Sequence, residues 1–134
     1  MPSLIEIEGV GPVYAQKLKD IGVATTGALL VKGASPEGRK EIEEKSGIGG
    51  KLILEWVNLA DLFRIKGVGE EYSDLLEEAG VDTVVELSQR NPENLYQKMA
   101  EVNAQKKLVR RLPTQAQVAD WVQQAKGLPR MVTY

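Results

Sequence analysis

Two Gly-Val-Gly tripeptides in this sequence could bind phosphate through their backbone. They are Gly9-Val10-Gly11 and Gly67-Val68-Gly69, and a helix is expected directly after each one. The glycines permit positive φ and close approach, while the central valine can enter the core and hold the turn. The first N–H groups of the following helix have no partner within that helix, so they can bind a phosphate oxygen with help from the helix dipole. Such contacts do not read base sequence.

A second candidate phosphate contact is a basic cluster near the end of the sequence. It consists of Lys106, Lys107, Arg110 and Arg111. Residues four apart share a helical face, so the spacing predicts two adjacent basic faces that could contact a phosphate backbone. The alternative is that these side chains pair with acidic residues of the first half, notably Glu41, Glu43 and Glu44, or stay solvated.

A third glycine-rich segment joins two predicted helices at 37–46 and 51–62. Its sequence is Gly47-Ile48-Gly49-Gly50-Lys51, which could form a third phosphate-binding hairpin. Lys51 supplies a basic side chain there, as Lys17 does near the first tripeptide. The alternative is structural, with a glycine stop after Ser46 and a helix cap at Gly49. The equivalent segment of the second half, Leu112-Pro113-Thr114, contains no glycine. The repeat described below therefore gives this third site no support.

The residue types that are missing limit the chemistry. The sequence has no cysteine and no histidine, which excludes disulfides, thiolate metal sites and cysteine nucleophiles, and removes the commonest general base. A lyase or nuclease would have to use residues such as Lys17, Lys19 or Asp74, and no motif singles them out. We therefore predict a protein that is not an enzyme, with no catalytic residues, no cofactor and no metal.

The charges are distributed unevenly along the chain. The net charge is −2, but residues 1–97 carry 10 basic and 17 acidic side chains, whereas residues 98–134 carry 7 and 2. This asymmetry favours an electrostatic partner for the basic end, which could be nucleic acid, an acidic protein or a second copy of the chain. No stretch approaches the roughly 18 apolar residues of a membrane span, and the first residues do not resemble a signal sequence. A soluble, cytoplasmic protein without membrane contact is expected.

The two tripeptides belong to an internal repeat, because residues 7–29 recur at 65–87. Nine positions from the first glycine onward are identical without a gap, which makes coincidence improbable. They are Gly9, Val10, Gly11, Tyr14, Leu18, Gly22, Val23, Thr25 and Leu29, which match Gly67, Val68, Gly69, Tyr72, Leu76, Gly80, Val81, Thr83 and Leu87. The repeated tyrosines are predicted to be core residues.

Apolar residues recur at helical spacing almost throughout, so the elements that position these candidates are predicted to be helices. Helices are expected at 12–21, 36–46, 51–62 and 92–108, with another from about Glu70 to Gly80 and a last one ending at Gly127. Ser35-Pro36-Glu37 and Asn91-Pro92-Glu93 have the pattern of helix starts. Thr25 or Thr26 can cap a short helix, and Thr83 with Glu86 forms a capping box for its counterpart. Each half closes with a helix that carries a tryptophan, Trp56 or Trp121, predicted to be buried.

The pattern Ile-x-Gly-Val-Gly-x-x-Tyr-x-x-x-Leu resembles the helix-hairpin-helix motif in both copies. Together with the two tryptophan helices, it is similar to a bacterial family of tandem helix-hairpin-helix domains whose function is unassigned. The resemblance implies that paired hairpins straddle the minor groove and contact phosphates on both strands. DNA-binding members usually place lysine or arginine two positions after the second glycine, whereas this sequence has Val13 and Glu71 there, with Glu70 beside the latter. Like charges at the second hairpin would oppose a phosphate.

The sequence therefore predicts an all-α fold of duplicated helix-hairpin-helix units with supporting helices, arranged as a pseudo-twofold single domain with halves 1–62 and 63–134. The predicted function is a non-catalytic module that binds duplex DNA through its backbone without sequence specificity. The alternative is a protein–protein interaction adaptor, or a self-assembling scaffold, that uses the same fold. This alternative accounts better for Glu70 and Glu71.

Overall fold

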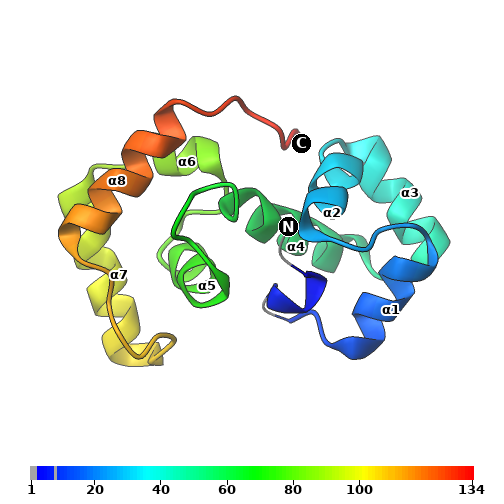
Figure 1. The fold of residues 1–134 in the computed structure, drawn as a ribbon, viewed down its shortest axis with the longest axis horizontal. Helices are drawn as coiled ribbons and strands as arrows, with labels where there is room; N and C mark the ends of the chain where they lie inside the picture. Colours follow the sequence, from blue (N-terminus) through cyan, green and yellow to red (C-terminus); the bar gives the residue numbers. More distant parts are fainter. Residues whose placement is uncertain (1–2, 8) are drawn as a thin grey trace. The chain divides into compact units, whose positions relative to one another are not determined.

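The computed structural model describes residues 3–7 and 9–134, and the elements it forms there are helices (Figure 1). In chain order they are the short 3-10 helix η1 (Leu4–Glu6) and the α-helices α1 (Pro12–Asp20), α2 (Thr26–Gly33), α3 (Pro36–Ser46), α4 (Gly50–Leu62), α5 (Glu70–Glu78), α6 (Val84–Ser88), α7 (Pro92–Lys106) and α8 (Gln115–Lys126). An isolated antiparallel bridge between Ser3 and Thr25 is the one β interaction in the described part of the chain. The prediction of an all-helical fold is confirmed.

The chain divides into two compact units. The first contains Met1–Asp61 together with Met131–Tyr134, and the second contains Leu62–Arg130. The division falls in the last turn of α4, close to the junction of the predicted halves, and the last four residues belong with the first unit. That the two halves make up a single domain stays a prediction.

In the first unit, the first Gly-Val-Gly turn is closed by a backbone hydrogen bond and by packing. The N–H of Val10 donates to the carbonyl of Ile7 at 3.1 Å, and both side chains are buried. Gly9 has a φ of +90°, in the left-handed region that favours glycine. A Cβ atom at Gly9 would lie 3.5 Å from Nε1 of Trp56. The turn is therefore held by its own apolar residues and by the indole ring from α4.

The second unit contains the same local contacts at the repeated residues. The N–H of Val68 donates to the carbonyl of Ile65 at 3.1 Å, and Gly67 has a φ of +97°. A Cβ atom at Gly67 would lie 3.2 Å from Nε1 of Trp121, which belongs to α8. The turn is again held between its own buried valine and a tryptophan from the last helix of the unit.

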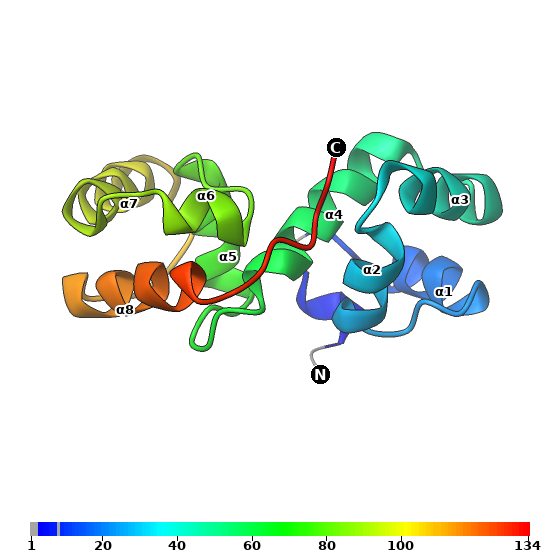
Figure 2. The ribbon, with the colours of Figure 1, turned by 90° about the horizontal axis from the view of Figure 1, so that it is seen from above.

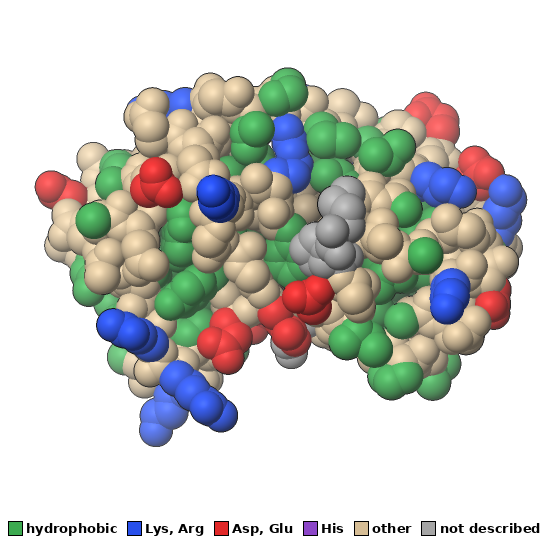
Figure 3. Space-filling model, viewed as in Figure 1, with side chains coloured by type: hydrophobic (Ala, Val, Ile, Leu, Met, Phe, Trp, Pro, Cys, Tyr) green, Lys and Arg blue, Asp and Glu red, His purple; other side chains and the backbone are tan. Residues whose placement is uncertain are grey.

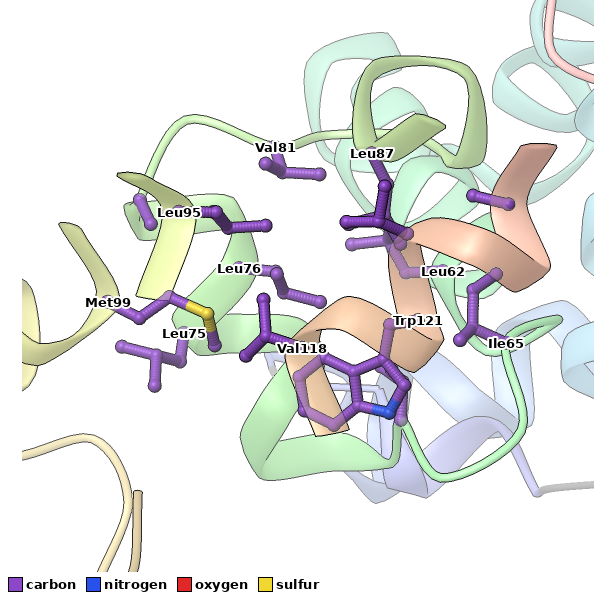
Figure 4. Packing of buried hydrophobic residues seen from close by; sticks show 14 of the residues in the cluster. Leu62, Ile65, Leu75, Leu76, Val81, Leu87, Leu95, Met99, Val118 and Trp121 are labelled. Atoms are coloured by element: carbon purple, nitrogen blue, oxygen red, sulfur yellow. The ribbon is translucent and has the colours of Figure 1, made fainter. Parts of the chain in front are cut away.

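Each of these tryptophans also packs against the repeated tyrosine of the helix after the turn. The ring centroids are 5.1 Å apart for Tyr14 and Trp56 and 5.3 Å apart for Tyr72 and Trp121, in the tilted arrangement that aromatic pairs prefer. The tryptophans are 1% and 2% exposed, so their predicted burial is confirmed, while the tyrosines are half-buried at the core edge. Figure 4 shows Trp121 beside Val118 in the core of the second unit, where α5, α7 and α8 contribute apolar side chains.

The helix starts follow the predicted cap residues. Ser35 and Asn91 accept hydrogen bonds from the backbone N–H groups three residues on, and Thr25 and Thr83 do the same for α2 and α6. The predicted capping box at Thr83 is half formed, because the carboxylate of Glu86 accepts a hydrogen bond from the backbone of Asp82 instead. Burial, followed by the charge of Asp82, raises the pKa of Glu86.

A buried arginine attaches the last residues of the chain to the first unit. Nη1 of Arg39 donates to the carbonyls of Gly33 at 2.8 Å and Ala34 at 3.1 Å, and Nη2 donates to that of Thr133 at 2.7 Å. The N–H of Thr133 donates in turn to the carbonyl of Ala34 at 2.8 Å. The hydroxyl of Tyr134 donates to Oδ1 of Asn58 on α4 at 3.1 Å. Figure 2 shows the red tail, residues 131–134, passing this helix. The tail is thus an integral part of the first unit.

We predict that Arg39→Ala lowers the free energy of unfolding by about 2–3 kcal/mol, because three hydrogen bonds from a charged donor are lost and the carbonyl of Ala34 keeps only its bonds from Thr133. Urea denaturation measures this change, and amide hydrogen exchange at Thr133 reports release of the tail. Lys40→Ala, at the exposed neighbouring residue, is the control and should change stability by no more than about 0.5 kcal/mol. Equal effects of the two substitutions would contradict the role given to Arg39.

Candidate nucleic-acid interface

The helix start after the first Gly-Val-Gly turn is apolar. Gly11 caps α1, and the first bond of the helix runs from the N–H of Ala15 to the carbonyl of Gly11 at 2.9 Å. Pro12 at the first helical position has no N–H, so one of the donors available at a helix start is missing. Val13 occupies the position where a basic side chain would help to bind a phosphate, and it is 69% exposed. Lys17 belongs to the last turn of α1 rather than to its start.

The helix start after the second Gly-Val-Gly turn is acidic. Gly69 caps α5, and Glu70 and Glu71 are exposed residues of its first turn. Carboxylates at this end stabilise a helix through its dipole. The same charges oppose a phosphate, so at this turn the helix dipole already interacts with the protein's own acids.

The third glycine-rich segment has the structure of a helix stop followed by a helix start. Gly47 ends α3 with a φ of +75° and donates its N–H to the carbonyl of Glu43 at 2.9 Å. Ile48 is buried, and α4 begins at Gly50, with the N–H of Ile53 donating to the carbonyl of Gly49 at 3.2 Å. A Cβ atom at Gly50 would collide with the carboxylate of Glu43, so an acidic group lies directly against this helix start. Lys51 is exposed in the first turn.

The basic segment, residues 106–111, is not the helix that its spacing predicts. Lys106 is the last residue of α7, and Lys107 ends the helix in the left-handed conformation with a φ of +51°. Beyond Lys107 the side chain of Asn103 takes the place of main-chain helical hydrogen bonds. Its Oδ1 accepts from the N–H of Val109 at 2.9 Å, and its Nδ2 donates to the carbonyl of Val109 at 3.2 Å. The prediction of two basic helical faces is therefore wrong.

Although it is not helical, the basic segment is fixed at several points. The side chain of Val109 is 6% exposed, and Leu108 and Leu112 pack against the core of the second unit. The hydroxyl of Tyr72 donates to the carbonyl of Arg111 at 3.0 Å. These contacts leave the four basic side chains exposed. Figure 3 shows Lys and Arg side chains gathered at the lower left, over the end of α7 and the segment that follows it.

Two ion pairs among the described residues each join side chains of the same unit. Nζ of Lys106 lies 2.6 Å from Oε2 of Glu78 on α5, and Nζ of Lys45 lies 2.7 Å from Oε1 of Glu41 within α3. The hydrogen bond from Lys45, together with its charge, lowers the pKa of Glu41. The partner of Lys106 is thus Glu78, rather than the acidic run at Glu41–Glu44 considered from the sequence. Both pairs are solvent-exposed and add little stability.

Residues 8–128 match a family described as Domain of unknown function (DUF4332). The chain belongs to this family. No significant match was found among curated proteins or among solved structures.

The DUF4332 match spans parts of both units, including both Gly-Val-Gly turns and the basic segment. In the described residues, no group of three or more acidic side chains is placed to hold a metal ion. None of the helices in residues 3–7 and 9–134 has the length and apolar character needed to cross a membrane.

Sequence reasoning missed the residues that fix the basic segment. Glu78, Asn103 and the hydroxyl of Tyr72 act on it through contacts between residues up to 39 positions apart. The one available signal was Asn103 itself, because asparagine near a helix end often bonds to nearby backbone groups. The polar contact of Tyr72 had no signal, because its repeated position indicated only a core residue.

We predict that Asn103→Ala lowers the free energy of unfolding of the second unit by about 1–2 kcal/mol, because Val109 loses both partners of its backbone polar groups. Amide hydrogen exchange at Val109 should accelerate as the N–H is released. Gln105→Ala is the matched control, since Gln105 is an exposed residue of the same helix. Unchanged exchange at Val109 in Asn103→Ala would show that other contacts hold the segment.

Proposed function

We propose that this chain is a non-catalytic module that binds the backbone of duplex nucleic acid without reading its sequence. The observation that carries the proposal is the basic segment, where Lys106, Lys107, Arg110 and Arg111 are exposed within six consecutive residues held by fixed contacts. Phosphates are the natural partner of such a cluster, because each lysine or arginine that neutralises one releases a condensed counterion.

The aromatic residues favour a duplex over a single strand. Binding of single strands relies on exposed rings that stack on successive bases. The indoles of Trp56 and Trp121 are buried, and Tyr14 and Tyr72 have their rings packed against them. These repeated aromatic residues therefore serve the core, and contacts to the sugar-phosphate backbone are the mode that the surface supports.

In this proposal the two turns are duplicated helix-hairpin-helix units related by a pseudo-twofold axis. The matching hydrogen bonds at Val10 and Val68, and the matching Gly–Trp contacts, support the duplication. Gly11 and Gly69 have φ values of −87° and −109°, with open space where a Cβ would stand. Because neither conformation nor packing requires glycine there, close approach of a partner's backbone is a reason for its presence. Val13 and Glu71 make these contacts weaker than those of the basic segment.

The test is fluorescence anisotropy of a labelled duplex of about 20 base pairs. With about three phosphates neutralised, the log–log slope against salt should be about −2.7, which weakens binding about 40-fold between 50 and 200 mM salt. Changing Lys106, Lys107, Arg110 and Arg111 to glutamate should abolish binding. The control changes four exposed lysines of the first unit, Lys19, Lys32, Lys40 and Lys45, to glutamate and so gives the same net charge. Equal loss of binding in both variants would indicate a net-charge effect instead of a site.

A second prediction concerns the two turns. Val13→Lys and Glu71→Lys should each tighten duplex binding about three- to tenfold at low salt. Each places a positive charge where the helix N–H groups point, and the second also removes a negative charge. Val13→Gln and Glu71→Gln separate the added charge from the removal of the original side chain. If neither lysine variant changes affinity in the same titration, the turns do not contact the duplex.

The alternative proposal is a protein-interaction adaptor or self-assembling scaffold with an acidic protein or a second copy as partner. Two observations favour it: Glu70 and Glu71 stand at the second turn, and Ile5 and Val13 are 52% and 69% exposed near the first. It requires that the protein ignore duplex DNA at about 50 mM salt. In its self-assembly form, it also requires a salt-sensitive oligomer in sedimentation, so a monomer at low salt excludes that form.

A further inference from the structure

Lys107 has a backbone conformation that its residue type disfavours. Its φ is +51°, and every other positive φ in the described residues belongs to a glycine. The corresponding helix end in the first unit, after α3, uses Gly47 with a φ of +75°. A residue with a Cβ is strained in this region, whereas glycine is not. The second unit therefore has a lysine where glycine would be more stable.

The strained residue lies within the basic segment. The N–H of Lys107 donates to the carbonyl of Asn103 at 2.9 Å, which closes the helix and turns the chain toward Val109. The side chain of Asn103 then fixes Val109 through both of its backbone polar groups, and Tyr72 fixes the carbonyl of Arg111. Arg110 lies between these two anchor points, and Lys107 lies at the turn before them.

The four basic side chains are not equivalent. Lys106 is already in an ion pair with Glu78 at 2.6 Å, so part of its charge is neutralised within the protein. Lys107, Arg110 and Arg111 are exposed, and the contacts that fix this segment hold its backbone rather than their charged groups. A rigid backbone that presents three cations loses less conformational entropy on binding than a flexible tail would.

We infer that Lys107, Arg110 and Arg111 form a preorganised contact for duplex phosphates, and that the strain at Lys107 is retained because its ammonium group binds the partner. Asn103 and Tyr72 act as positioning residues for this contact. The inference rests on the proposed function and deepens it, because strain without another structural benefit is characteristic of functional sites. It separates this segment from the two turns as the principal contact.

Lys107→Gly tests the inference, because it should affect stability and binding in opposite directions. Relief of the strain should raise the thermal unfolding midpoint by roughly 3–6 °C. Loss of the ammonium should weaken duplex binding about threefold or more at 50 mM salt and reduce the salt slope by about 0.9. Lys107→Asn removes the charge but keeps a side chain that tolerates this conformation, and it should weaken binding similarly. Lys107→Arg should bind like the original protein.

A matched control removes one charge from the same unit outside the segment. Lys126→Gln serves, because Lys126 is exposed in the last turn of α8. It should leave the salt slope unchanged. If Lys107→Gly raises the unfolding midpoint but binds the duplex as tightly as the original protein, the inference is overturned and the strain has no binding role.

The positioning residues require a different readout. Asn103→Ala and Tyr72→Phe remove no charge, so each should weaken binding about two- to fivefold while the salt slope stays the same. Titration well below the unfolding midpoint ensures that both variants are folded. Unchanged affinity in both would overturn the positioning role. If the original protein fails to bind a duplex at about 50 mM salt, the proposed function fails along with this inference. If the original protein binds but the substitutions at Lys107, Asn103 and Tyr72 leave its affinity for the duplex unchanged, the proposed function stands and the inference does not.

Discussion

The contact on which each unit depends is the close approach of a buried indole ring to a turn glycine. Trp56 lies against Gly9 and Trp121 against Gly67, where a Cβ atom on the glycine would lie 3.5 Å and 3.2 Å, respectively, from the indole Nε1. The repeated tyrosine packs on the same indole from the following helix. One aromatic residue thereby joins the turn, the helix after it and the last helix of the unit. The positions of the helix starts that could meet a ligand follow from this contact.

Much of the fold could be predicted from the sequence, because its signals are local and repeated. Ser35 and Asn91 are themselves the cap residues of the helices that follow them, so these helix starts are encoded locally. The burial of the two tryptophans could be predicted because the pattern around them occurs twice. The end of α7 could not be predicted, since charged residues at helical spacing continue beyond Lys106, and the helix ends at a lysine in the left-handed conformation followed by a side-chain contact from Asn103 to Val109. The attachment of the tail to Arg39 depends on residues 94 positions apart, for which the spacing gives no signal.

The candidate site was predicted only in composition, because electrostatics at a helix start depend on what lies against it. All three glycine-rich segments are followed by a helix, yet one helix start is apolar, one carries Glu70 and Glu71, and one faces the carboxylate of Glu43. The same helix dipole can stabilise a phosphate or the protein's own acid. In the basic segment Lys106 is paired with Glu78, whereas Lys107, Arg110 and Arg111 lie beyond the end of α7 and are exposed.

The discontinuous first unit has a consequence for how the chain is made. In sequence, the second unit is an insertion between Asp61 and Met131, so the first unit is completed only when residues 131–134 have been synthesised. Two acceptors of Arg39, the carbonyls of Gly33 and Ala34, are synthesised before it. The third, the carbonyl of Thr133, is synthesised only after the whole second unit. During synthesis, the continuous second unit can therefore close before the first one is finished.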